Sequence, residues 1–171
     1  MQAMRRILLL PALVGLLALP GASNAVRLAP GDGTLSVRDG LGMVYLSARG
    51  AVIGRVDRAK RIVVTDLSES DGSEPLLKGC NERDYDKEEK TTFCKGKNIT
   101  FRVTRGKYEF RVVGEGIDLS AVGKGKVELR GDGELDWDDD KSLDDGFYKF
   151  GDDKWQSLPD GPKAKKFQLG D

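Results

Sequence analysis

Short stretches in which apolar and polar residues alternate, separated by glycines, constrain the fold of this chain more than any other feature. Leu35 and Val37 alternate with polar neighbours, and Phe101 and Val103 do the same further along the chain. A period of two with one apolar face is typical of a half-buried β-strand. The glycines favour turns between such strands, because glycine tolerates positive φ. The sequence therefore predicts an all-β domain, arranged as a sandwich, a small barrel or a short β-solenoid.

Two segments of the chain resemble each other when the sequence is shifted by 66 residues. Residues 33–65 then align with residues 99–131, and Val44 falls on Phe110. The order of glycines and apolar pairs is shared without a gap over about 30 residues. The similarity predicts an internal duplication, with two pseudo-repeated units of four short strands each. Chance similarity between glycine-rich strands is the alternative explanation.

The first 25 residues have the features of a secretory signal peptide. Two arginines precede an apolar run from Ile7 to Leu19, and small residues stand at the expected cleavage site before Val26. An uncleaved membrane anchor is the alternative, although prolines and polar residues interrupt the uncharged stretch. We therefore expect residues 1–25 to be removed. Residues 26–171 are then a single domain without a transmembrane segment, either secreted or associated with the cell envelope.

The chain has two cysteines, Cys80 and Cys94, in the polar segment 67–97 that separates the two similar units. In an exported protein, such a pair favours a disulfide. A redox pair usually has the spacing Cys-x-x-Cys, which does not occur here. In the chain-entropy model, a disulfide that closes a loop of this length contributes about 3 kcal/mol. We expect residues 67–97 to form a surface loop stapled by this disulfide.

The chain contains no histidine. Its absence excludes Ser-His-Asp and Cys-His catalysis and removes the histidine metal ligand. Glycosidases need only two carboxylates, so that chemistry stays open. The strand carboxylates that are candidates for it are Glu109, Glu115, Asp118 and Glu128. Because nothing in the sequence pairs them at the required separation, we expect a non-catalytic protein without a cofactor. A carboxylate-dependent, glycan-active enzyme is the alternative.

Four arginines are predicted on the polar sides of their strands, namely Arg38, Arg102, Arg111 and Arg130. If they share one face, that face suits anionic partners such as envelope polysaccharides, lipid headgroups or nucleic acid. Alternatively, these arginines only deter edge pairing and keep the protein soluble. The formal net charge of zero gives no general bias toward nucleic acid. The predicted function is therefore a binding or structural role at the envelope or outside the cell, with an anionic envelope polymer or another protein as partner.

The C-terminal region, residues 132–171, begins with acidic residues and continues with aromatic ones. The acidic cluster consists of Asp132, Glu134, Asp136, Asp138, Asp139, Asp140, Asp144 and Asp145. Its spacing begins like an EF-hand calcium loop, but Lys141 replaces the glycine and Phe147 the closing glutamate. A solvated loop is the prediction, and a Ca²⁺ site is the alternative. The aromatic part, residues 147–158, predicts a hairpin, and Phe167 to Leu169 predict a last short strand.

Three features of the chain occur together: the leader, a glycine-bounded motif and an aromatic closing motif. The glycine-bounded motif is Gly116-Ile117-Asp118-Leu119-Ser120-Ala121-Val122-Gly123, followed by Gly125-Lys126-Val127-Glu128-Leu129, and the closing motif is Trp155-Gln156-Ser157-Leu158-Pro159. With these features the chain resembles small secreted β-rich proteins of actinomycete-type bacteria, for which no activity is known. The resemblance implies a β-rich fold and an exported location, and it supplies no site residues.

Overall fold

The structure is a computed structural model that describes residues 30–68, 74–132, 145–160 and 163–171. The described residues contain seven β-strands and no helix, which confirms the all-β prediction. The strands are β1 (Gly33–Asp66), β2 (Leu76–Asp86), β3 (Thr91–Val103), β4 (Lys107–Gly131), β5 (Phe147–Phe150), β6 (Gln156–Ser157) and β7 (Lys165–Leu169). They form one sheet in the order β2-β3-β1-β4-β7, with β5 on β1 and β6 on β5. All of the pairings are antiparallel.

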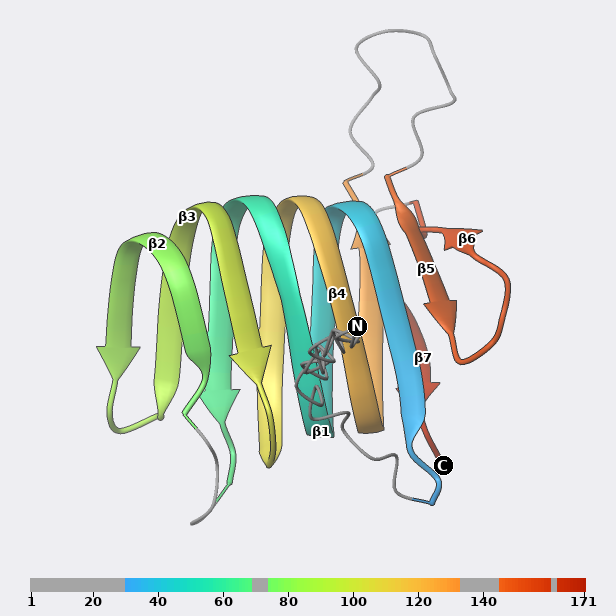
Figure 1. Cartoon of the computed structure of the whole chain (residues 1–171), viewed down its shortest axis with the longest axis horizontal. Coiled ribbons are helices and arrows are strands. Elements are labelled where there is room, and N and C mark those ends of the chain that lie inside the picture. The colour runs from blue at the N-terminus through green and yellow to red at the C-terminus, as the bar shows by residue number, and fades with distance from the viewer. Residues whose placement is uncertain (1–29, 69–73, 133–144, 161–162) are drawn as a thin grey trace, which may run out of the picture.

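The long strands bend so that the single sheet makes two layers, one in front and one behind (Figure 1). Tyr45 of β1 pairs with Arg111 of β4 on one side and with Glu128 of β4 on the other. β1 therefore pairs with one part of β4 along one edge and with a later part of β4 along its other edge. This happens when the two strands coil together as a ribbon, so that successive turns of the ribbon lie side by side. Each long strand therefore passes from one layer to the other, and the open, two-layered arrangement excludes the small barrel from the three predicted forms.

Small residues lie in cross-strand register where the strands bend. Along the upper corner in Figure 1, consecutive pairings join Gly131, Gly42, Gly114, Ala59, Gly96 and Cys80. Along the lower corner, Gly123 pairs with both Gly33 and Gly50. A Cβ atom at Gly50 or Gly123 would overlap a backbone carbonyl oxygen of the neighbouring strand. Glycine at a sharp corner of a sheet permits this close approach of two backbones.

The structure differs from the sequence prediction in the role of these glycines. They were expected to end short strands, whereas β1 runs without interruption from Gly33 to Asp66. Pairing with the neighbouring strand continues on both sides of Gly50, so the chain bends there without needing a turn. The four short strands expected in residues 33–65 are thus segments of one bent strand. The internal duplication itself stays a prediction.

The apolar sides of both layers face each other and form the core. Its fully buried side chains include Leu35, Val44, Leu46, Val56, Ile62, Ile99, Phe110, Val112, Ile117, Val127 and Leu129. Phe101 from the front part of β3 meets Phe110 from the back part of β4, with ring centroids 4.7 Å apart. Burial of each such side chain contributes about 1.5–3 kcal/mol. The core therefore holds the two layers together face to face.

The segment 67–97 is not the surface loop that the sequence predicts. It contains β2 and the first part of β3, which pair as a hairpin. The predicted disulfide between Cys80 and Cys94 is present and joins these two strands, with a Cα–Cα distance of 5.4 Å. β2 is an edge strand in which Leu77 is the only buried residue, so its sequence lacks a clear apolar alternation. Without that alternation, an edge strand reads as a polar loop.

The C-terminal hairpin is confirmed, because β5 pairs with β6 and β7 forms the last strand. β5 extends the front layer on β1, and β7 extends the back layer on β4. The rings of Tyr148, Phe150 and Phe167 pack against one another there. Of the acidic cluster, only its first and last members are described, so the Ca²⁺ hypothesis lies outside the described residues. The same holds for the predicted signal peptide, residues 1–25.

Replacing Tyr108 with phenylalanine is expected to leave stability unchanged or to raise it. Tyr108 is 2% exposed, and its hydroxyl has no hydrogen-bond partner among the described residues. Burial raises the pKa of this phenol, so the group stays neutral. A buried hydroxyl without a partner costs about 1–3 kcal/mol, and Tyr108→Phe removes that cost. Urea denaturation measures the effect, and a loss of more than about 1 kcal/mol would show that the hydroxyl is hydrogen-bonded in solution.

Candidate functional site

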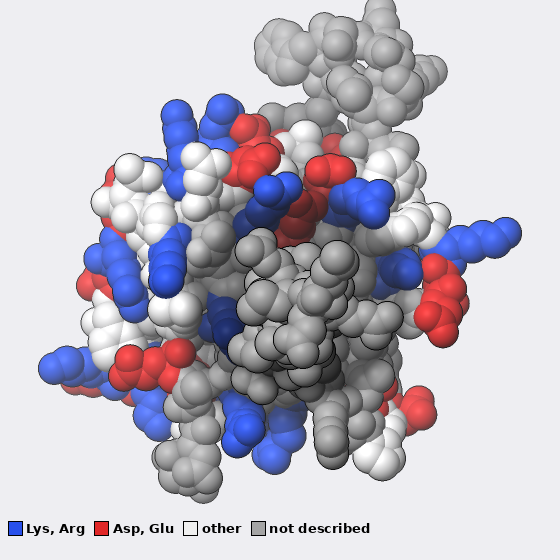
Figure 2. Space-filling view, viewed as in Figure 1, with Lys and Arg blue, Asp and Glu red and all other residues white. Residues whose placement is uncertain are grey.

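A shallow groove with a volume of about 850 Å³ crosses the outer surface of the front layer. Side chains from β1, β2, β3 and β4 line it, and Trp155 closes one end. Figure 2 shows this side of the molecule, with both basic and acidic side chains on the part of it that is visible. Because residues two apart on a strand share a face, the groove is built from alternate positions of neighbouring strands.

The register of the strands aligns the groove residues in two rows that cross the sheet. In the first row, the neighbours in order are Ser36, Ser120, Ile53, Arg102 and Leu76. Directly opposed residues have Cβ atoms about 4.5–5.5 Å apart, so their side chains are in reach of each other. Arg102 therefore lies between two aliphatic side chains, Ile53 and Leu76, which are 56% and 50% exposed.

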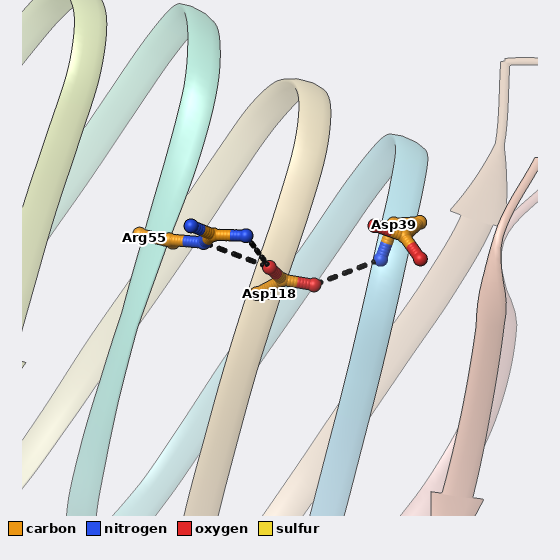
Figure 3. Close-up of polar contacts among 3 residues, drawn as sticks. All are labelled: Asp39, Arg55 and Asp118. Atoms are coloured by element: carbon orange, nitrogen blue, oxygen red, sulfur yellow. Dashed lines mark hydrogen bonds and ion pairs between the residues drawn. The ribbon is translucent and has the colours of Figure 1, made fainter.

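The second row contains an ion pair at its centre. Arg55 lies opposite Asp118 on one side and opposite Thr100 on the other, and Thr100 lies opposite Lys78. The Arg55 guanidinium binds Asp118 Oδ2 through Nη2 at 2.8 Å and through Nε at 2.9 Å (Figure 3). Asp118 Oδ1 accepts a hydrogen bond of 2.9 Å from the backbone N–H of Asp39. Both oxygens of this carboxylate are thus occupied within the protein.

The Trp155 end of the groove is formed by a contact between an aromatic ring and two cations. Trp155 lies in the connection between β5 and β6. The guanidinium carbon of Arg38 lies 4.9 Å from the centroid of the Trp155 ring, and Lys149 Nζ lies 5.4 Å from it. Such contacts are worth about 0.5–1 kcal/mol at exposed sites. They fix the ring beside the basic residues of the groove.

The groove is positively charged. Its ionisable residues are Arg38, Asp39, Arg55, Lys78, Arg102 and Asp118. Asp118 is paired with Arg55. Among the described residues, Arg38, Lys78 and Arg102 form no ion pair. Three cations on one face are therefore available to an anionic ligand.

The structure brings together two of the four arginines selected from the sequence, Arg38 and Arg102. Arg111 instead lines a second groove of about 390 Å³ on the back layer, where its guanidinium carbon lies 5.2 Å from the centroid of the Tyr45 ring. Arg130 is also in the back layer, opposite Met43. Alternation correctly places each arginine on the outer side of its strand. It does not show which layer the strand segment belongs to, because the layer changes at every corner.

The four carboxylates considered for glycosidase chemistry are spread over both layers, with Glu109 and Glu128 on either side of β1 in the back layer. Asp118 lines the front groove, Glu109 the back groove, and Glu115 a small pocket at the upper corner. Three of them form ion pairs: Asp118 with Arg55 at 2.8 Å, Glu115 with Arg58 at 2.7 Å and Glu128 with Lys166 at 3.7 Å. In the described parts of the chain, no group of three or more acidic or cysteine side chains is arranged to hold a metal ion.

The groove residues that were not selected from the sequence as site residues include Ile53, Leu76, Lys78 and Trp155. Two of them carried a signal, because Val52-Ile53 and Leu76-Leu77 are adjacent apolar pairs within strands. Neighbouring residues in a strand point to opposite faces, so one member of each pair has to face outward. Val52 and Leu77 are the buried members, at 1% and 5% exposure. For Trp155 the sequence allows a platform on which a sugar ring stacks, but an ordinary hairpin core is the prediction.

Comparison with protein-family models, with curated proteins and with solved structures finds no match to this chain. A search of the described residues for a helix long and apolar enough to cross a membrane finds none. The function is therefore inferred from the residues of the front groove.

Proposed function

We propose that this protein is an exported, non-catalytic binding domain whose front groove takes an anionic component of the cell envelope. The observation that carries the proposal is the set of three cations, Arg38, Lys78 and Arg102, that form no ion pair with the described residues. A cleft lined by one sign of charge concentrates ligands of the opposite sign. The planar guanidinium of arginine matches phosphate and carboxylate groups in two-point contacts.

The proposed location rests on the leader and on the disulfide. The leader predicts export with cleavage before Val26. The Cys80–Cys94 disulfide is compatible with an extracellular location, because disulfides persist in oxidising compartments. An exported domain with a cationic groove meets the anionic polymers and lipids of the envelope directly.

The proposal includes the internal duplication, with which the strand register is compatible. A shift of 66 residues equates Val44 with Phe110 and Leu46 with Val112. In the sheet, Val44 pairs with Val112 and Leu46 pairs with Phe110. Antiparallel pairing produces this exchange between any two segments, so the register is compatible with two intertwined copies related by a two-fold axis. In this view the two layers arose by the coiling of one duplicated ribbon.

The test of the proposed function is charge reversal on one layer at a time. We expect the protein to be retained on a heparin matrix at low salt and to be released by salt, because salt screens exposed charges. Arg38→Glu/Arg102→Glu weakens this binding by at least about tenfold. Arg61→Glu/Arg111→Glu is the matched control on the back layer, because both arginines line the back groove and the change of net charge is the same.

The retention volumes of the two variants show whether heparin binds at the front groove or is attracted by the net charge of the protein. Loss of retention in the front variant alone supports the groove as the binding site. Equal losses in both variants would show that only net charge matters. A wild-type protein that is retained neither on heparin nor on anionic lipid vesicles at low salt would rule out the proposed function.

A further inference from the structure

Exposed apolar side chains are concentrated in the front groove. Among the described residues, the large hydrophobic side chains that are exposed are Leu41, Ile53, Leu67, Leu76, Tyr85 and Trp155. Ile53, Leu76 and Trp155 all line this one groove. Exposed apolar groups that gather in one place mark an interaction site, whereas scattered ones need no explanation. The ligand of the groove therefore has an apolar part as well as negative charge.

The apolar and basic side chains are interleaved. Arg102 lies between Ile53 and Leu76 in one row, and Lys78 follows Leu76 two residues later on the same face of β2. At a membrane surface, aliphatic side chains enter the boundary between headgroups and acyl chains. Lysine and arginine side chains keep their aliphatic stems at this boundary and extend their charged ends to the lipid phosphates. The interleaved row of the front layer matches both requirements at once.

A soluble acidic polysaccharide fits the groove less well. Sugar rings stack on an aromatic face, but Arg38 and Lys149 already contact the ring of Trp155. Ile53 and Leu76 would keep facing water beside a hydrated polymer, and that leaves their exposure unexplained. A bilayer surface removes both side chains from water while the basic residues keep their anionic partners.

Resting on the proposed function, we infer that the anionic component is the surface of a lipid bilayer, onto which the front layer docks as a peripheral membrane face. Ile53 and Leu76 enter the interface, and Arg38, Lys78 and Arg102 bind lipid phosphates. Each basic residue near an anionic membrane raises affinity by about fivefold. The three together give a binding that depends on anionic lipid and weakens with salt.

The test is co-sedimentation with lipid vesicles. The protein is expressed from the complete sequence, with its own leader, and is purified after export. Vesicles of phosphatidylcholine containing phosphatidylglycerol are compared with vesicles of phosphatidylcholine alone. Ile53→Ser/Leu76→Ser removes the aliphatic groups and keeps every charge, and we expect it to lower affinity for the anionic vesicles by at least about tenfold. Leu41→Ser/Leu67→Ser is the control, because it removes two exposed leucines that do not line the groove. All variants share one N-terminus, so any contribution from the leader cancels.

Tryptophan fluorescence reports whether the groove itself meets the lipid. The chain has two tryptophans, and Trp137→Phe leaves Trp155 as the only one. On addition of anionic vesicles, we expect the emission of Trp155 to shift to shorter wavelength and to be quenched by brominated acyl chains. The emission should not change with vesicles of phosphatidylcholine alone.

Each outcome separates this inference from the proposed function. Binding to heparin without binding to anionic vesicles would overturn the membrane inference and leave the proposed function standing. Vesicle binding that Ile53→Ser/Leu76→Ser does not weaken would also overturn it. Absence of binding to both probes would remove the proposed function as well. Vesicle binding that this variant loses, with heparin binding retained, supports the lipid surface as the ligand.

Discussion

Replacing Gly123 with alanine lowers the free energy of unfolding by about 3 kcal/mol or more. Gly123 lies at the lower corner, where it pairs with Gly33 and Gly50 in the two strand segments beside it. Its φ of 144° lies in a region that residues other than glycine rarely adopt. An added Cβ would also overlap the carbonyl oxygen of Arg49. Relief of the overlap requires two backbones to separate at the point where the sheet bends. The substitution therefore weakens the backbone hydrogen bonds between the strands along this corner.

Gly151→Ala separates the effect of the close approach from that of the dihedral angle. Gly151 has a positive φ of 50°, and nothing lies within 4 Å of the position of an added Cβ. We expect this variant to lose only about 1 kcal/mol, from backbone strain. Urea denaturation of both variants measures the difference. Losses of equal size would show that the contact between backbones at the corner does not limit substitution.

Removing the disulfide by Cys80→Ser/Cys94→Ser lowers the free energy of unfolding by about 3 kcal/mol. The bridge joins positions 14 apart in sequence and ties β2 to β3. Because β2 is an edge strand that pairs only with β3, no second neighbouring strand compensates for the loss. β2 also brings Leu76 and Lys78 to the groove, so the far end of the site depends on the same strand.

Denaturation with and without reductant checks this second prediction. Reductant should lower the stability of the wild-type protein to that of the double variant and leave the variant unchanged. The intact mass of the wild-type protein should rise by two hydrogens on reduction. A double variant as stable as the wild-type protein would contradict a stabilising role of the bridge.

The sequence was sufficient to predict the all-β class, the disulfide and the C-terminal hairpin. The first rests on the alternation of residues such as Leu35 and Val37, and the others rest on short local signals. It was insufficient for the path of the long strands. A glycine that ends a strand and a glycine that bends one look alike in sequence, because both need a missing Cβ. In the structure, Gly123 pairs with both Gly33 and Gly50, and this pairing shows that it bends a strand and does not end one.

The candidate site was predicted only in part, because the sequence does not show where the long strands bend from one layer to the other. Arg38 and Arg102 were selected correctly as outward residues, yet Arg111 and Arg130 were selected with them on equal grounds. The layer of a residue depends on how many corners precede it, which alternation does not record. Ile53 was not selected as an outward residue, although its neighbour Val52 occupies the inward position. Adjacent apolar residues in a strand are thus a better signal for an exposed apolar site than composition is.

The central claim is that the front groove, and not the charge of the whole surface, binds the anionic ligand. Nuclear magnetic resonance of the protein during titration with soluble heparin tests it most directly. We expect the side-chain N–H signals of Arg38, Arg102 and Trp155 to shift together and to saturate, while those of Arg61 and Arg111 stay in place. Shifts of Arg61 and Arg111 equal to those of the groove residues, or confined to the back layer, would contradict the claim.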